Sequence, residues 1–273
     1  MPTTPRRPRR TAKTADKHEL YQLAVQAPEV DAPFLRRYFT RLVGRAPRSL
    51  REDFCGTALL AAHWVAMRRE HRAIGVDFDQ DTLDWGRRHN VDGKLDDEQR
   101  SRLQLLHADV RAVHAPPVDL IVAFNFSYSL FMTRDALRAY FAHVREGLVR
   151  DGLFVIDAWG GSETLDEREE RRRVEDFTYC WEQARFDPIT HHSECRIHFR
   201  FMDGSVMRNA FRYRWRLWIL PELVELLGEA GFRDVHVLWE GTDRKTNQGN
   251  SRYRRVERGE ADPAWVGYVV GRA

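Results

Sequence analysis

The spacing of hydrophobic residues changes along this 273-residue chain and divides it into three stretches. In the first stretch, apolar positions recur every three to four residues, the period of an amphipathic helix, and predict helices over 16–26 and 32–43. From residue 49 to residue 157, short apolar runs alternate with helical patterns. After residue 161, strand-like runs follow one another with turns between them.

The middle stretch predicts an α/β fold. Strands are expected at 49–53, 72–77, 103–109, 118–124 and 153–157. Helices are expected at 58–69, 80–90 and 134–148, and residues 149–152 are expected to form a turn. Strands and helices that alternate in this way form a parallel sheet with helices on both faces, joined by right-handed crossovers.

The last stretch predicts an antiparallel insert and then the end of the sheet. Residues 163–173 carry a dense run of charges, which is expected to form a solvent-exposed helix. Strands are expected after it at 177–186, 193–201 and 206–215. A helix at 221–230 and two strands at 234–240 and 265–270 are expected to complete the fold.

Polar and acidic residues follow the predicted parallel strands, at the point where each strand ends. Ligands of such sheets bind outside the carboxyl ends of the strands, near the point where the strand order reverses. The residues in these positions are 52–57, 77–79, 108–109, 125–128 and Asp157. Their recurrence at one edge predicts a ligand site there.

Composition narrows the class of protein only a little. Hydrophobic residues make up 42% and charged residues 31% of the chain, and the net charge is +3. No apolar run approaches the roughly 20 residues of a membrane span, and no apolar core follows the basic N-terminus. Cys55, Cys180 and Cys195 form no CxxC pair, so we expect a reducing, cytoplasmic location and neither a disulfide framework nor a cysteine zinc site.

Residues 1–15 are expected to be a disordered basic tail. They contain five arginine and lysine residues, no acid and three prolines. This tail is either a solubilising terminus or an arm that binds nucleic acid. It lacks the apolar face that a mitochondrial transit peptide needs.

The loop after the first strand contains Cys55-Gly56-Thr57, with Glu52 before it. It resembles the first motif of class I S-adenosylmethionine-dependent methyltransferases, acidic-x-Gly-x-Gly-x-Gly, although Phe54 and Ala58 replace the outer glycines. S-adenosylmethionine has no phosphate, so a loop with fewer glycines is tolerable. A dinucleotide needs close backbone approach to its pyrophosphate, which Phe54 would obstruct, so the alternative of a nucleotide-linked oxidoreductase is disfavoured.

Two further segments carry the same resemblance. Residues 74–79 resemble the second motif of the family, in which an acidic side chain, here Asp77, binds both ribose hydroxyls. Residues 106–109 resemble the third, which places Asp109 at the adenine amino group. The cofactor-binding residues implied by the resemblance are Tyr21, Glu52, Phe54, Cys55, Gly56, Thr57, Asp77, Phe78, Asp79, Ala108, Asp109, Val110 and Asn125.

The resemblance extends from about Tyr21 to the C-terminus and implies a fold and a division of the chain. The fold is a Rossmann-like, doubly wound, mostly parallel sheet of seven strands with an antiparallel last strand. It carries an N-terminal helical lid and an inserted antiparallel β cover. The implied segments are a lid at 16–48, a cofactor-binding core at 49–161, a substrate cover at 162–218 and completion of the core at 219–273.

Candidate catalytic residues are Asn125, Tyr128 and His192. Residues 125–128 occupy the position where methyltransferases of amino groups often carry Asn-Pro-Pro-Tyr, which would hold an amine and stack on a flat substrate. Core packing is the other interpretation of Tyr128. On a strand, His192 and His198 share one face with Glu194 between them, either as a pocket wall with a general base or as a solvated face.

Two other kinds of chemistry are not favoured. A metal site on that strand is not expected, because residues of one strand spread too widely for tetrahedral coordination. Cys55 is expected to line the cofactor site or to pack there, since the resemblance implies that a cysteine nucleophile would follow the fourth strand.

The function implied is methylation of nitrogen or oxygen on a small molecule, with S-adenosylmethionine as cofactor and S-adenosylhomocysteine as product. One alternative is an RNA or protein methyltransferase that uses the basic tail. Another is a protein that binds the cofactor without catalysis. No membrane partner is expected, and the oligomeric state, a homodimer included, is left open.

Overall fold

The computed structural model describes residues 10–242 and 249–273, which form two compact units. Unit 1 consists of Met1–Gln26, described from residue 10, and Leu165–Leu217. Unit 2 consists of Ala27–Thr164 and Trp218–Ala273. Of the predicted helical lid at 16–48, the first helix therefore belongs to unit 1 and the second to unit 2.

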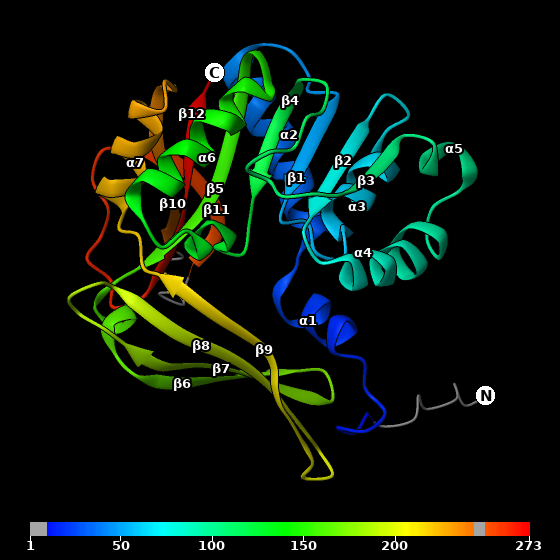
Figure 1. Ribbon diagram of the computed structural model, residues 1–273, viewed down its shortest axis with the longest axis vertical. Helices are drawn as coiled ribbons and strands as arrows, with labels where there is room; N and C mark the ends of the chain where they lie inside the picture. Colours follow the sequence, from blue (N-terminus) through cyan, green and yellow to red (C-terminus); the bar gives the residue numbers. More distant parts are fainter. Residues whose placement is uncertain (1–9, 243–248) are drawn as a thin grey trace. The chain divides into compact units, whose positions relative to one another are not determined.

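Unit 2 is built on a sheet of eight strands in the order β11-β10-β12-β5-β4-β1-β2-β3 (Figure 1). The strands are β1 (Ser49–Asp53), β2 (Arg72–Asp77), β3 (Leu103–His107), β4 (Val118–Ala123), β5 (Leu148–Gly160), β10 (Arg233–Thr242), β11 (Gly249–Val256) and β12 (Trp265–Arg272). The strands β1 to β5 pair in parallel, β12 is antiparallel to its neighbours β5 and β10, and β11 is antiparallel to β10. The predicted doubly wound sheet with an antiparallel last strand is confirmed.

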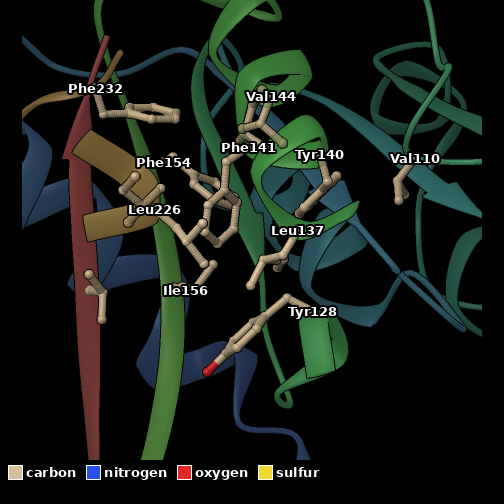
Figure 2. Packing of buried hydrophobic residues seen from close by; sticks show 14 of the residues in the cluster. Val110, Tyr128, Leu137, Tyr140, Phe141, Val144, Phe154, Ile156, Leu226 and Phe232 are labelled. Atoms are coloured by element: carbon tan, nitrogen blue, oxygen red, sulfur yellow. The ribbon is translucent and has the colours of Figure 1, made fainter. Parts of the chain in front are cut away.

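Helices cover both faces of this sheet because its central strands are apolar on both sides. Along β4, Leu120 and Val122 pack with α2 and α3, whereas Ile121 and Ala123 pack with α6 and α7. The helices are α2 (Pro28–Val43), α3 (Leu59–Met67), α4 (Gln80–Gly86), α5 (Asp97–Arg100), α6 (Arg134–Glu146) and α7 (Leu220–Glu229). A π-helical turn, Arg87–Asp92, extends α4, and 3-10 turns lie at Ser127–Leu130 and Ser162–Leu165. Figure 2 shows Phe141 and Phe154 in the core between α6 and the sheet.

Unit 1 is an antiparallel sheet of four strands, with one helix packed on its apolar face. The strand order is β6 (Arg168–Val174), β7 (Phe177–Phe186), β8 (His192–Phe201) and β9 (Val206–Arg216). Helix α1 (Lys17–Val25) begins at Asp16, whose carboxylate accepts the backbone N–H groups of His18 and Glu19. Leu20 and Ala24 of α1 then pack against the sheet, on Phe177, Ile197, Phe199 and Phe201.

The structure corrects the sequence interpretation of residues 163–173, which were expected to form a helix. They contain a 3-10 turn and most of β6. β6 is an edge strand, so it needs only one partner strand, and charged side chains suit an edge because they oppose aggregation. The run of charges therefore predicted correctly that the segment is exposed, but the helix expected there is a strand.

Two strand predictions are also corrected. β11 was not predicted, so the sheet has eight strands where seven were expected; its polar, glycine-containing sequence lacks the usual strand composition. The turn expected at residues 149–152 lies inside β5, where the register with β4 shifts and Asp151 adopts a positive φ of 65°.

Residues 10–15, the described part of the predicted disordered tail, are ordered on unit 1. Arg10 forms ion pairs with Glu19 (3.0 Å), Glu175 (2.9 Å) and Asp176 (2.6 Å). The disorder prediction is wrong for these residues because it took the basic residues as unpaired, and two of the three acids that pair with Arg10, Glu175 and Asp176, lie far away in sequence.

A buried ion pair lies under α6. Arg51, 2% exposed, donates through Nε to Asp53 Oδ1 (2.8 Å), and the Tyr140 hydroxyl donates to Asp53 Oδ2 (2.9 Å). Gly147 allows this arrangement, since a Cβ there would come within 2.5 Å of an Arg51 guanidinium nitrogen. All three polar side chains are thus satisfied inside the core.

We expect Asp53→Ala to destabilise the protein by about 3–5 kcal/mol, because it leaves the Arg51 charge buried without a partner. Urea unfolding measures this. Glu229→Gln, which breaks the exposed pair of Arg134 and Glu229, is the matched control and should leave the unfolding midpoint unchanged. Equal small effects of both variants would contradict the assignment of Arg51 and Asp53 as a core pair.

Candidate functional site

The carboxyl ends of the parallel strands bring the predicted site residues of unit 2 to one edge of the sheet. Register pairs Asp77 with His107 across β2 and β3, and Ala123 with Ile156 across β4 and β5. Asp157 therefore lies beside the loop that follows β4. The strand-end residues expected to form a ligand site do lie at the same edge.

The loop at residues 54–58 has an unusual backbone. Phe54, Gly56 and Ala58 all have positive φ, at 56°, 53° and 54°. Gly56 adopts this conformation without a Cβ penalty, whereas Phe54 and Ala58 need compensation from their surroundings. The Phe54 ring packs against the Tyr140 ring, with centroids 5.7 Å apart, and this contact compensates for the disfavoured backbone conformation of Phe54.

Asp77 organises this loop from the end of β2. Its Oδ2 accepts the Gly56 N–H (2.7 Å) and its Oδ1 accepts the Asp79 N–H (2.9 Å). Burial raises the Asp77 pKa, and the hydrogen bonds from these backbone groups act in the opposite direction. Each carboxylate oxygen keeps a further lone pair, so Asp77 can accept two hydrogen bonds from a diol.

Two residues that sequence reasoning missed support the loop from behind. A Cβ on Gly86 of α4 would lie 2.4 Å from the Thr57 carbonyl oxygen, so only glycine permits this approach. The buried Asn90 side chain donates to the same oxygen (2.8 Å). No motif marks these positions; they follow from the close packing of α4 on the loop, and Thr57 itself is buried.

Glu52 is buried at the end of β1 and acts on the helix that follows. Its Oε2 accepts the Ala61 N–H of the first turn of α3 (2.9 Å). Burial, together with the nearby carboxylates Asp77 and Asp31, raises the Glu52 pKa to about 8. Cys55 is buried beside it, and burial raises the Cys55 pKa well above its usual value, so its thiol stays protonated and is a poor nucleophile.

The ends of β2 and β3 carry an exposed aromatic ring and a paired acid. Phe78 is 77% exposed, unusual for a phenylalanine, and its carbonyl oxygen lies 2.9 Å from His107 Nε2. Asp109 accepts from Arg111 Nε at 3.0 Å, and this hydrogen bond lowers the Asp109 pKa. Ala108 donates its N–H to the Asp77 carbonyl oxygen (3.0 Å), while Val110 turns into the core. The exposed Phe78 ring and the Asp109 carboxylate suit a flat aromatic ligand that carries a hydrogen-bond donor at its edge.

The loop after β4 is held by Asp157 of β5. Asn125 and Phe126 both have φ of 57°, and both donate their N–H groups to the Asp157 carboxylate, at 2.7 and 2.9 Å. Tyr128, in the 3-10 turn that follows, is 1% exposed, and its ring packs in the core beside Leu137 (Figure 2). Tyr128 therefore packs in the core, as its second sequence interpretation expected, and its catalytic role stays a prediction.

Three buried or half-buried carboxylates interact near this edge: Asp31 of α2, Glu52 and Asp157. Asp31 accepts a hydrogen bond from the Tyr268 hydroxyl, and burial raises its pKa to about 6. Burial raises the Asp157 pKa to about 7, and the charge of Asp31 adds to this effect. Asp31 was not expected from the sequence, because α2 carries no motif of the site.

The remaining site residues belong to unit 1, which is described by itself. Tyr21 of α1 packs its ring on Phe211, with centroids 5.0 Å apart. His192 is half-buried at the start of β8. His198 on the same strand is 5% exposed, with its Nε2 3.0 Å from Glu182 Oε2 and its Nδ1 accepting the Asn209 N–H (2.8 Å). The proposed roles of Tyr21 and His192 stay predictions.

The described residues contain no group of three histidine, cysteine, aspartate or glutamate side chains placed to hold a metal ion. None of their helices is long and apolar enough to cross a membrane. A shallow hollow of about 600 Å³ lies at the opposite edge of the sheet, lined by residues including Ser49, Arg72 and Pro117, away from the carboxyl ends.

Compared by sequence, the chain matches no protein family and no curated protein. Compared by structure, it is similar to an S-adenosylmethionine-dependent methyltransferase from Clostridium acetobutylicum ATCC 824, at 16% identity and a TM-score of 0.66, over 93% of this chain and 96% of that one. It is similar to the sugar N-methyltransferase KedS8 from Streptoalloteichus sp ATCC 53650, at 18% identity and a TM-score of 0.63, over 100% and 97%.

A third similar structure is CalS10 with bound S-adenosylmethionine, an amino pentose methyltransferase from Micromonospora echinaspora. It is 13% identical, with a TM-score of 0.64, over 93% of this chain and 95% of that one. These likenesses span nearly the whole chain and show that it has the fold of S-adenosylmethionine-dependent methyltransferases.

We expect the ligand-free protein to lose stability as pH rises from 7 to 8.5. Glu52 and Asp157 have folded-state pKa values of about 8 and 7, above their unfolded values, so the folded state binds more protons until pH passes these values. Each group contributes a slope of at most about 1.4 kcal/mol per pH unit. Burial lowers the His71 and His236 pKa values, so those residues oppose the trend only below about pH 6.5.

Urea unfolding at both pH values measures this fall. Glu52→Gln keeps an acceptor for the Ala61 N–H but cannot ionise, so the fall should be smaller in this variant. Glu225→Gln, on the exposed side of α7, should reproduce the wild-type fall. A Glu52→Gln variant with the full wild-type fall would contradict the raised pKa of Glu52.

Proposed function

We propose that this protein is an S-adenosylmethionine-dependent methyltransferase that acts on a small molecule and releases S-adenosylhomocysteine. The observation that carries the proposal is Asp77. In a methyltransferase fold, its carboxylate lies at the end of β2, bound to the Gly56 N–H and open to a diol. When bound, S-adenosylmethionine supplies an electrophilic methyl group on a positively charged sulfur.

The residues of the edge fit this cofactor. Asp77 would bind the ribose hydroxyls, the exposed Phe78 ring would cover the adenine, and Asp109 would accept from its amino group. The raised pKa values of Glu52 and Asp157, about 8 and 7, would fall beside a positively charged sulfur, so both groups would ionise on binding and favour the cation. The loop at 54–58 would lie against the cofactor, with Cys55 and Thr57 buried in its support.

For the acceptor we favour an amine on a small molecule. Asn125 follows β4, and its amide would accept a hydrogen bond from an amino group and orient it. The charge of Asp31, whose pKa is about 6, would attract an amine that arrives protonated, and the amine would lose that proton to Asp31 or to solvent before its lone pair attacks the methyl group. KedS8 and CalS10 act on sugars, and their likeness to this chain is consistent with such an acceptor.

An acceptor that carries phosphate, RNA included, is the second candidate. Arg208, Arg212 and Arg214 of β9 are exposed and form no ion pair with any residue of the described ranges. Arg212 also lies directly opposite Arg196 on β8, a like-charge pair that an anion would relieve. In contrast, Arg10 of the basic tail is already paired with acids of unit 1.

Asp77→Ala should weaken binding of S-adenosylmethionine by roughly 100-fold or more, because two charge-assisted hydrogen bonds are lost. Isothermal titration calorimetry measures this. Asp81→Asn, an exposed acid in the first turn of α4, is the matched control and should keep wild-type affinity. Tight binding to an Asp77→Ala variant that still unfolds cooperatively would rule out the ribose assignment.

Methyl-labelled cofactor, offered with pools of small amines, small alcohols and short RNAs, should transfer label to an amine. The product's fragmentation pattern in mass spectrometry locates the new methyl group. Transfer to RNA that is lost in an Arg212→Gln/Arg214→Gln variant would replace the small-molecule proposal with the second candidate. Cofactor binding without transfer to any pool would favour a non-catalytic binding protein.

A further inference from the structure

Two consecutive residues after β4 adopt a conformation that their side chains disfavour. Asn125 and Phe126 both lie in the left-handed region, with φ of 57°. Asparagine is tolerated there as a single residue, but phenylalanine is a rare occupant, and a pair is rarer still. Such a backbone persists only where surrounding contacts over-determine it, and such positions cluster at functional sites.

The contact that holds this pair is the Asp157 carboxylate. Oδ2 accepts the Asn125 N–H at 2.7 Å and Oδ1 accepts the Phe126 N–H at 2.9 Å, so both oxygens are used. Other bonds close the turn: Ser127 Oγ donates to the Phe124 carbonyl oxygen, and the Ser129 N–H donates to that of Phe126. These are short-range bonds within the loop, whereas the two bonds to Asp157 connect the pair to β5 of the sheet.

We propose that Asp157 is a positioning residue of the methyl-transfer site. It fixes the backbone of Asn125 and Phe126 and thereby orients the side of the loop that would bind the acceptor. This inference rests on the proposed function, because it gives Asn125 its role. Asp157 itself touches backbone groups and not the reacting atoms. Asn125 and Phe126 supply the acceptor surface, and the Phe126 ring is in turn braced by Trp159 of β5, with centroids 5.8 Å apart.

The two hydrogen bonds from the Asn125 and Phe126 N–H groups depend on the ionisation of Asp157. An ionised carboxylate accepts at both oxygens, whereas a protonated one has an O–H donor where one of the two N–H groups points. Burial raises the Asp157 pKa to about 7, so the two forms exchange near neutral pH. The loop should therefore be held fully above pH 7 and loosened below it.

Groups from four neighbouring elements act electrostatically on Asp157. They are Asp31 of α2, Tyr128 of the 3-10 turn, Tyr253 of β11 and Tyr268 of β12. No arginine, lysine or histidine in the described ranges forms an ion pair with Asp157. A positive sulfonium at this edge would favour the ionised form, so binding of the cofactor and fixing of the loop should support each other.

The test follows the amide groups directly. Asn125-Phe126 and Phe124-Asn125 are the chain's only dipeptides of their kinds, so pairwise carbonyl-¹³C and amide-¹⁵N labelling isolates each amide signal in a carbonyl-edited spectrum. In the cofactor-free wild type, both amide signals should titrate together with a midpoint near pH 7. In Asp157→Asn this titration should disappear. Asp151→Asn, on the same strand and outside the site, should keep it.

Steady-state kinetics supply the second readout. Asp157→Asn should lower kcat about 100-fold, the loss typical of a small misplacement, with little change in the KM for S-adenosylmethionine. Asp151→Asn should leave both constants at their wild-type values. The kcat of the wild type should fall as pH drops through 7, and that fall should be absent from Asp157→Asn.

The outcomes separate this inference from the function on which it rests. Amide signals that do not titrate between pH 5 and 9, or that titrate in Asp157→Asn as in the wild type, overturn the inference even if the protein is an active methyltransferase. An unchanged kcat in Asp157→Asn also overturns it. Titrating amides in a protein that transfers no methyl group to any acceptor would instead overturn the proposed function.

Discussion

The candidate site depends on one kind of interaction, a side-chain carboxylate that accepts backbone N–H groups at the end of a parallel strand. Asp77 holds the loop after β1 through Gly56, Glu52 holds the first turn of α3 through Ala61, and Asp157 holds the loop after β4. Each of these backbone groups would otherwise lack a partner at the sheet edge. The same acids that would contact a ligand therefore also build the loops around it.

This arrangement has an electrostatic cost that a ligand can relieve. Asp31, Glu52 and Asp157 are removed from water without a basic partner among residues 10–242 and 249–273, and their pKa values rise accordingly to about 6, 8 and 7. The buried Asp53, in contrast, is paired with Arg51 on the other side of the sheet. A cationic cofactor or acceptor would supply the missing positive charge, so the charge pattern of the edge and the methyltransferase fold support the same proposal.

Unit 1 has an apolar face and a row of exposed arginine residues. Its sheet has an apolar face that packs on α1 and arginine residues along the exposed edge strand β9. The continuous run of charges at 168–173 forms the edge strand β6 of this sheet rather than the helix expected at 163–173, because an edge strand requires pairing on one side only. The likeness to known methyltransferases covers both units, and at 13–18% identity it establishes the fold alone.

The sequence by itself determined the alternation of strands and helices in unit 2, since short runs such as 118–123, apolar apart from Asp119, have the length and composition of strands buried on both faces. It also located Asp77, Asp109, Asn125 and the loop at 54–58, because these follow strands directly in the chain. Only the tertiary structure decided what approaches them from elsewhere: Gly86 and Asn90 behind the loop, Asp31 from α2, Tyr128 turned into the core, and Asp157 bound to Asn125. Local pattern encodes which residues end a strand, whereas the partner of a buried polar group is set by packing between segments distant in sequence.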